Sequence, residues 1–171
     1  LEDDTPNFDF RHNNCSFYSG TKALGEETLK GAENCFIWRL RIPFDERNNP
    51  RNYLSKPLSY EWLLDAENSI SQRFEFINAC LDCFEKGIPS GVYNVTNPGA
   101  ISAREITEIM KKHGLVKKEL KFFASEEAFM SEVVRAPRSN CIMSSEKLAS
   151  IGIQLKEVHE AVEIACQNWV E

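Results

Sequence analysis

The sequence lacks features that mark whole classes of protein. It has no uninterrupted apolar run near the ~20 residues that cross a membrane. Its first residues, Leu-Glu-Asp-Asp-Thr-Pro, have neither the basic start nor the apolar stretch of a secretory signal. Basic side chains are not in excess, because 26 acidic and 20 basic residues leave a net charge of −6. We therefore expect a cytoplasmic protein that binds neither a membrane nor the phosphate backbone of a nucleic acid.

Patterns that form disulfides or bind metals are also scarce. The six cysteines are spread over the whole chain, which is typical of free thiols in a reducing compartment and not of a disulfide scaffold. Cys80 and Cys83 have the two-residue spacing of a zinc site, but there is no second such pair and the three histidines are scattered. We interpret the pair as two cysteines one helical turn apart, and we expect no metal.

The sequence does contain enough apolar residues for a core. Hydrophobic residues make up 42% of the 171 positions, and this length suits one domain or slightly more. Apolar spacing of three and four residues and capping patterns predict helices at residues 19–32, 51–58, 72–86, 102–113, 125–131, 144–151 and 155–170. Runs of strand-forming residues predict strands at residues 35–42, 61–65, 91–96 and 118–123. The alternation predicts an α/β protein with fewer strands than a doubly wound sheet usually has.

One predicted helix begins with residues that can do chemistry. Tyr18 and Lys22 are four positions apart, which places them on one face of the helix. An ammonium beside a phenol favours the ionised oxygen. A tyrosine tuned in this way can give a proton to a carbonyl oxygen while hydride arrives at the carbon. Taken alone the spacing is common, and a pair of surface residues is the plainer interpretation.

The surroundings of this pair resemble a known family. The helix precedes an apolar strand with a proline at its exit, as in the short-chain dehydrogenase/reductase superfamily. Segments that occur in the same order in the nucleotide-sugar epimerase/reductases of L-rhamnose synthesis are Phe17-Tyr-Ser-Gly-Thr-Lys-Ala23, Arg39-Leu-Arg-Ile-Pro43, Asn48-Asn-Pro-Arg-Asn52, Tyr93-Asn-Val-Thr-Asn-Pro-Gly99 and Ala136-Pro-Arg-Ser-Asn140. The resemblance spans nearly the whole chain. It implies part of a Rossmann-like fold together with a small α/β substrate domain.

The resemblance implies roles at the reaction centre. Tyr18 would give the proton to the 4-keto oxygen of the sugar, and Lys22 would hold the nicotinamide ribose of NADP(H) or NAD(H). Pro43 would lie near the nicotinamide. Arg41 belongs to the same strand, where an outward charge is an equally good interpretation. Lys56 matches the acid/base that exchanges protons beside the ketone during epimerisation, although without the resemblance a solvated helical lysine would be favoured.

Further residues are candidates for contact with the substrate, which the resemblance makes a nucleotide sugar. Arg51 and Asn52 lie in a loop that the family places near the substrate, and a polar turn is the alternative interpretation. Arg138 and Asn140 belong to the segment that reaches the diphosphate. Arginine suits diphosphate binding because its planar guanidinium donates two parallel hydrogen bonds. We expect a few placed arginines, and not a basic surface, to meet the anionic ligand.

Parts of such an enzyme have no counterpart in the sequence. None of the eight glycines forms the Gly-rich turn that binds the cofactor pyrophosphate. The catalytic Ser or Thr of the superfamily and the cysteine that partners the epimerisation lysine are also missing. We therefore predict a single unit, the C-terminal half of the enzyme, in which residues 1–50 end the Rossmann-like part and 51–171 mainly bind substrate. The start at Leu1 fits a cut before the tyrosine, and we expect the isolated chain to be inactive.

The functional hypotheses fall into different classes. The leading one is NAD(P)H-dependent reduction, with 3,5-epimerisation, of an NDP-4-keto-6-deoxy sugar. A simple 4-keto reductase is the nearest alternative. A non-catalytic regulatory subunit related to the rhamnose reductases is another, and the retention of Tyr18 and Lys22 argues against it. A generic interaction domain is the last. Helices of the superfamily often pair subunits, so a homodimer also stays open.

Overall fold

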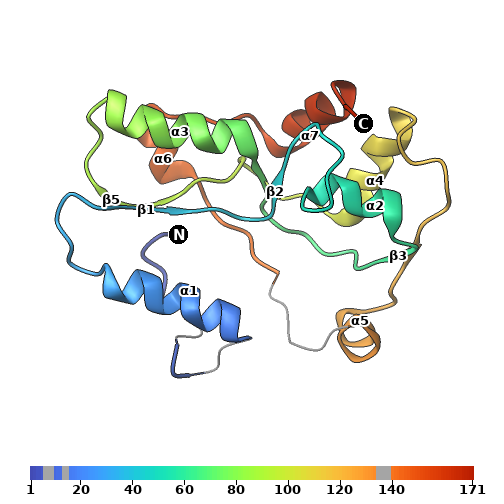
Figure 1. The fold of residues 1–171 in the computed structure, drawn as a ribbon, viewed down its shortest axis with the longest axis horizontal. Coiled ribbons are helices and arrows are strands. Elements are labelled where there is room, and N and C mark those ends of the chain that lie inside the picture. The colour runs from blue at the N-terminus through green and yellow to red at the C-terminus, as the bar shows by residue number, and fades with distance from the viewer. Residues whose placement is uncertain (6–9, 13–15, 134–139) are drawn as a thin grey trace.

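The computed structural model describes residues 1–5, 10–12, 16–133 and 140–171. Two parallel strands form its central layer, β1 (Phe36–Arg39) and β5 (Gly91–Asn94), with Phe36 opposite Gly91. Helix α1 (Phe17–Thr28) lies on one side of these strands and α3 (Arg73–Glu85) on the other (Figure 1). This layering is the predicted α/β arrangement.

The first strand is shorter than predicted. Its residues Phe36, Ile37 and Trp38 are good strand formers, but the strand ends at Arg39 and does not continue to Ile42. Ile42 has a φ of +39°, a region that β-branched residues rarely adopt. The chain turns there and enters β2 (Pro43–Phe44). Pro43 is tolerated at this place because the first residue of a strand need not donate to the ladder.

The remaining strands form two further parallel pairs. Strand β2 pairs with β4 (Ser71–Gln72), and β3 (Trp62–Leu63) pairs with β6 (Lys121–Phe122). Strand β4 was not predicted, because two polar residues carry no strand pattern. The hydroxyl of Ser71 donates to the carbonyl of Val95 at 2.8 Å, which ties β4 to the segment that follows β5.

The other helices occur in the predicted order. They are the 3₁₀ turn η1 (Tyr53–Ser55), α2 (Lys56–Ser59), α4 (Ala103–Lys112), α5 (Glu126–Glu132), α6 (Glu146–Ser150) and α7 (Val158–Gln167). The predicted capping box at Ser102 and Glu105 is confirmed, since each side chain accepts from the other residue's backbone N–H. Ser125 likewise caps α5, as predicted. Within the described part of the chain, no helix is long and apolar enough to span a bilayer.

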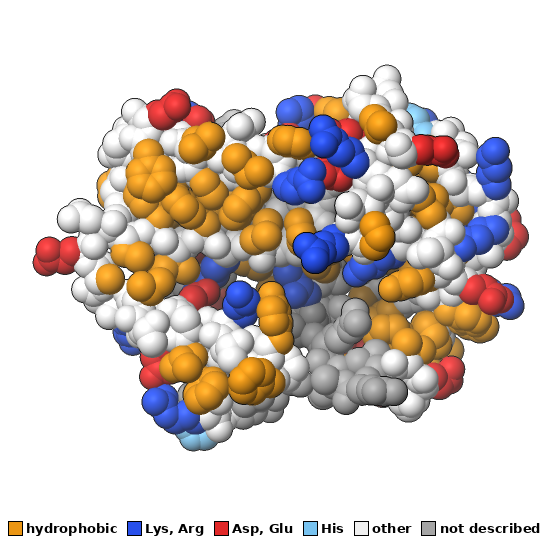
Figure 2. Space-filling model, in the orientation of Figure 1, with side chains coloured by type: hydrophobic (Ala, Val, Ile, Leu, Met, Phe, Trp, Pro, Cys, Tyr) orange, Lys and Arg blue, Asp and Glu red, His pale blue; other side chains and the backbone are white. Residues whose placement is uncertain are grey.

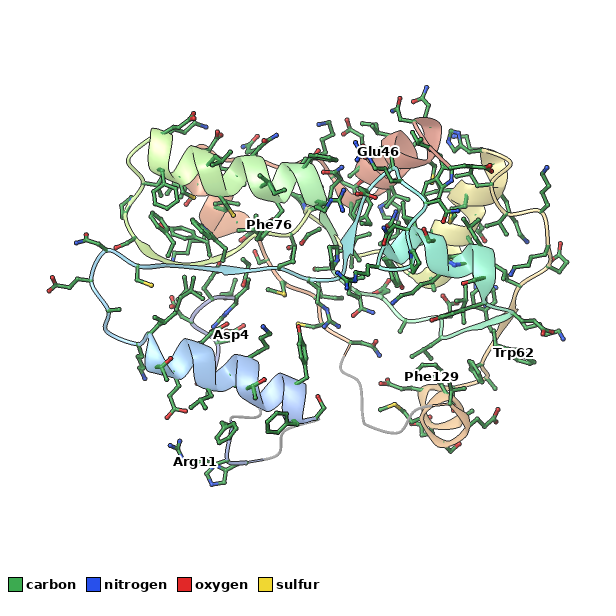
Figure 3. All side chains as sticks on the ribbon, in the orientation of Figure 1. Asp4, Arg11, Glu46, Trp62, Phe76 and Phe129 are labelled. Carbon is green, nitrogen blue, oxygen red and sulfur yellow. The ribbon has the colours of Figure 1, made fainter. Side chains whose placement is uncertain are left out.

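Two apolar clusters hold these elements together. One lies around α4 and α7, with Met110 and Val162 fully buried at its centre. The other joins α3, β5 and α6, and Phe76 of α3 packs against it from above the strands (Figure 3). The second cluster therefore packs β1 against elements that follow residue 50 in the chain. The predicted division of the chain at residue 50 stays a prediction.

Candidate active site

Helix α1 places Tyr18 at the carboxyl end of β1. Its first turn is fixed by a reciprocal cap, in which Ser16 accepts from Ser19 N at 3.1 Å and Ser19 accepts from Ser16 N at 3.0 Å. The guanidinium of Arg39, at the end of β1, donates two hydrogen bonds to the carboxylate of Glu26 in α1. The distances are 3.0 Å from Nε and 2.7 Å from Nη2. The helix and the strand run in opposite directions (Figure 1). The start of α1 and the carboxyl end of β1 therefore lie on the same side, near the middle of the view (Figure 1).

Tyr18 and Lys22 share one face of α1. The ammonium of Lys22 lies over the Tyr18 ring, 5.3 Å from its centroid, a distance at which a cation interacts with an aromatic face. Both side chains are open to solvent, and Tyr18 is 70% exposed. The pair is thus available to a ligand. Its catalytic role stays a prediction.

A polar network follows the carboxyl end of β1. Arg41 donates through Nη2 to Asn68 Oδ1 at 2.7 Å, and the backbone N–H of Cys141 donates to the same oxygen at 3.0 Å. Asn68 Nδ2 in turn donates to Asn140 Oδ1 at 3.2 Å. The structure therefore brings the predicted residues Arg41 and Asn140 together through the buried Asn68. Sequence reasoning missed Asn68, because no motif includes it.

Tyr53 places Lys56 in the same neighbourhood. The ammonium of Lys56 lies over the Tyr53 ring, 5.2 Å from its centroid. Burial raises the pKa of Tyr53, and the positive charge of Arg41 opposes this rise. The Tyr53 hydroxyl is therefore neutral near pH 7, and its ring lies within the electrostatic reach of Arg41 and against the ammonium of Lys56. We expected neither contact of Tyr53 from the sequence.

Asn52 holds the loop that carries Arg51. It is only 6% exposed, and its Nδ2 donates to the carbonyls of Asp45 at 2.8 Å and Arg47 at 2.7 Å. Its Oδ1 accepts from Leu54 N at 3.1 Å. The amide thus fixes the loop and leaves Arg51 exposed at the tip. Substrate contacts for Asn52 and Arg51 stay predictions.

The other predicted site residues differ in how far they can be placed. Pro43 is exposed at the start of β2, beside the end of β1. Arg138 lies outside the described residues. Lys and Arg side chains gather in the middle of the face drawn in Figure 2, around the ends of β1 and β2. Ligands of parallel α/β sheets bind beyond the carboxyl ends of the strands, so this basic region is where an anionic ligand is expected.

Burial keeps two of the described cysteine thiols protonated. Cys35, Cys80, Cys83, Cys141 and Cys166 are free. Burial raises the pKa of Cys80 to about 11 and that of Cys166 to about 12, so both thiols stay protonated at neutral pH. Within the same residues, no group of three or more His, Cys, Asp or Glu side chains is placed to hold a metal ion.

Comparison with known proteins gives relatives that are longer than this chain. No protein-family model matches the sequence. A bifunctional dTDP-4-dehydrorhamnose 3,5-epimerase/dTDP-4-dehydrorhamnose reductase from Arabidopsis thaliana is 36% identical over 162 residues, which are 94% of this chain and 51% of that enzyme. The chain is homologous to part of a nucleotide-sugar epimerase/reductase. It spans about half the length of the relative.

Solved structures confirm the fold of the chain. The UDP-rhamnose synthase L780 from Acanthamoeba polyphaga mimivirus superposes with a TM-score of 0.84 at 24% identity, over 98% of this chain and 56% of that one. The dTDP-4-dehydrorhamnose reductase from Bacillus anthracis, solved with NADP, superposes with a TM-score of 0.70 at 20% identity, over 91% and 57% of the two chains. The predicted fold class, α/β and part of a Rossmann-like fold, is confirmed.

Proposed function

We propose that this chain is the part of a nucleotide-sugar epimerase/reductase that carries the proton donor and most of the substrate contacts. The reaction is the reduction of an NDP-4-keto-6-deoxy sugar by NAD(P)H, with epimerisation at C3 and C5. The single observation that carries the proposal is the exposed Tyr18–Lys22 pair at the carboxyl end of β1. Similarity to the Arabidopsis epimerase/reductase supports assigning this reaction to the pair.

The chemistry of the pair suits a reductase. The Tyr18 hydroxyl donates a proton to the 4-keto oxygen of the sugar, and the positive charge of Lys22 stabilises the phenolate that is left. The donors present also fit a nicotinamide cofactor, because the Lys22 ammonium is exposed and can donate to ribose hydroxyls, while Pro43 offers an apolar surface beside the end of β1. NAD(P)H supplies the hydride when it is bound.

The network around Arg41 suits the anionic part of the substrate. Asn68 fixes both the Arg41 guanidinium, at 2.7 Å, and the Asn140 amide, at 3.2 Å. A guanidinium held in one orientation binds a diphosphate through paired hydrogen bonds. Arg51, exposed on its loop, and Arg138 add charge for the same group. Lys56 is the residue we assign to proton exchange beside the ketone during epimerisation.

The test of this function is kinetic and uses an enzyme that contains the chain together with a cofactor-binding half. We expect Tyr18→Phe to lower kcat for reduction by roughly 10²–10⁴-fold, the usual contribution of a positioned proton donor. Tyr60→Phe is the matched control, because Tyr60 is also exposed and lies apart from α1, at the end of α2. An unchanged kcat in the Tyr18 variant would contradict the role of Tyr18.

Two further measurements separate the alternatives. Deuterium exchange into C3 and C5 of the sugar, lost in Lys56→Gln, distinguishes an epimerase/reductase from a simple 4-keto reductase. Fluorescence titration of the isolated 171-residue chain with NADPH tests whether it works alone. We expect negligible binding there, and micromolar affinity would contradict the proposal that the cofactor site needs a second part.

A further inference from the structure

The loop that carries Arg51 is bonded to the segment that follows helix α7. Val170 N donates to the carbonyl of Glu46 at 2.8 Å, and Asn48 N donates to the carbonyl of Val170 at 2.8 Å. These bonds flank Arg47, which forms a parallel β-bridge with Val170. Figure 3 shows Glu46 beside α7. The segment after α7 therefore holds the first part of this loop through backbone hydrogen bonds.

The bridge is attached to the core through Trp169. We call Trp169 and Val170 the α7 strap. Trp169 packs against the apolar cluster around α4 and α7, in which Ala165 and Cys166 of the last turn of α7 are buried. The side chain of Val170, in contrast, is 55% exposed. Val170 therefore acts on the loop through its backbone and not through the packing of its side chain.

Further hydrogen bonds connect the bridge to Arg51. Asn49 directly follows the bridged Asn48, and its Oδ1 accepts from Arg51 N at 2.9 Å. The carbonyl of Asn49 accepts from Asn52 N at 2.8 Å, and its N–H donates to Ser55 Oγ at 3.0 Å. Asn49 thus fixes the backbone at Arg51 and immediately after it. A displacement of Asn48 would therefore also move the backbone that carries the Arg51 side chain.

The exposure of the loop explains why it needs this attachment. Residues 47–51 are all exposed, so burial contributes little to holding this stretch in place. A segment with few buried contacts opens locally at a low cost in free energy. Asn52 fixes the loop from its buried side, where its Nδ2 donates to the carbonyl of Arg47. The α7 strap holds the same stretch from the side of α7.

We propose that the α7 strap positions Arg51 for the anionic part of the substrate, so that Trp169 and Val170 are positioning residues that act on substrate binding through Arg51. Paired hydrogen bonds from a guanidinium to a diphosphate depend on geometry. A loop released from the strap would hold Arg51 in the binding position for only part of the time, and the apparent affinity falls by that fraction. This inference rests on the proposed function in taking Arg51 as a substrate contact.

The experiment uses an enzyme that contains the chain together with a cofactor-binding half. Val170→Pro removes the N–H that donates to the Glu46 carbonyl, because proline has no backbone donor. We expect KM for the keto sugar to rise roughly three- to tenfold, which corresponds to one lost backbone hydrogen bond. The kcat should change less than about twofold, because the strap affects binding and not the chemical step. Val170→Ala is the matched control, since it keeps the N–H and shortens an exposed side chain, and its KM should stay within about twofold of the wild type.

A double-variant cycle tests whether Arg51 mediates the effect. Arg51→Ala should itself raise KM, and Val170→Pro should then add less than about twofold, because residues that act through one contact are not additive. Amide hydrogen exchange in the same enzyme, without substrate, shows where the chain loosens. Exchange at Asn48 and Asn52 should become faster in Val170→Pro, while exchange at the buried Met110 of α4 should stay unchanged.

Several results would overturn the inference. One is a fall in kcat with an unchanged KM, because a merely structural role lowers only the amount of active enzyme. Others are effects of Val170→Pro and Arg51→Ala on KM that multiply, and a rise in KM that Val170→Ala reproduces. An enzyme that does not reduce the keto sugar counts against the proposed function, and the same variants are then compared by their calorimetric Kd for UDP. A Kd that Val170→Pro leaves unchanged overturns the inference, whereas a rise that is absent in the Arg51→Ala background supports it.

Discussion

Replacing Asn68 by alanine tests whether one buried amide organises the substrate side of the molecule. Asn68 is 7% exposed and makes hydrogen bonds of 2.7 Å with Arg41, 3.0 Å with Cys141 N and 3.2 Å with Asn140. A hydrogen bond between neutral groups contributes ~1 kcal/mol and one to a charged group roughly 1.5–3 kcal/mol. Because such contributions do not add fully, we expect Asn68→Ala to lower the free energy of unfolding by about 3 kcal/mol. For a domain of this size the corresponding loss in Tm is roughly 6–12 °C.

Urea unfolding followed by circular dichroism measures this loss in the 171-residue chain. Asn68→Asp keeps the acceptor for Arg41 and Cys141 and loses the Nδ2 donor, which bonds to Asn140 at 3.2 Å and to the Ala66 carbonyl at 3.4 Å, so it should destabilise the chain less than the alanine variant does. Asn78→Ala on the exposed side of α3 is the matched control and should stay within ~0.5 kcal/mol of the wild type. A loss below ~0.5 kcal/mol in Asn68→Ala would refute the idea that the amide holds Arg41 and Asn140 in place.

Two other predictions concern stability. Asn52→Ala should cost about 3 kcal/mol in urea unfolding, because its amide bonds to the Asp45 backbone at 2.8 Å and to the Asp45 carboxylate at 3.0 Å are both buried; a change under ~1 kcal/mol would contradict this. The pKa of His159 is raised above 6.5, chiefly by its 2.8 Å bond to Glu157 with help from Glu105 and against desolvation. The stability that charged His159 contributes is therefore complete below pH 6.5 and is lost as the pH rises through the raised pKa. The urea midpoint should fall in that range, and His159→Gln should flatten this part of the profile.

Local patterns predicted most of the fold. The helix around Phe76 and the capping box at Ser102 depend on residues within one or two turns, and both are present. The errors in the strands have a common cause. The early end of β1 depends on the φ of +39° at Ile42, and β4 forms because Ser71 lies next to β2, over 20 residues earlier in the chain. Neither a positive φ at one residue nor the pairing of two strands far apart in the chain leaves a periodic signal in the sequence.

The candidate site was likewise only partly predictable from the sequence. Tyr18 and Lys22 were predictable, because a four-residue spacing on a helix is itself a spatial relation. The resemblance to a family supplied Arg41 and Asn140, but not the reason that they meet. That reason is Asn68, which lies in an unremarkable polar segment and makes contacts 27 and 72 positions away in the chain. A single sequence contains no sign of such a residue, since its role exists only once three distant segments have packed together.

The exposure of Tyr18 fits the proposal that this chain is one part of a larger enzyme. A tyrosine that gives its proton to a carbonyl works in a site from which bulk water is excluded, yet Tyr18 is 70% exposed and its neighbour Phe17 is 82% exposed. Helix α1 begins on the side towards which β1 runs, near the middle of the view (Figure 1). We therefore expect Tyr18 to be covered only in the complete enzyme, and the isolated chain to be inactive.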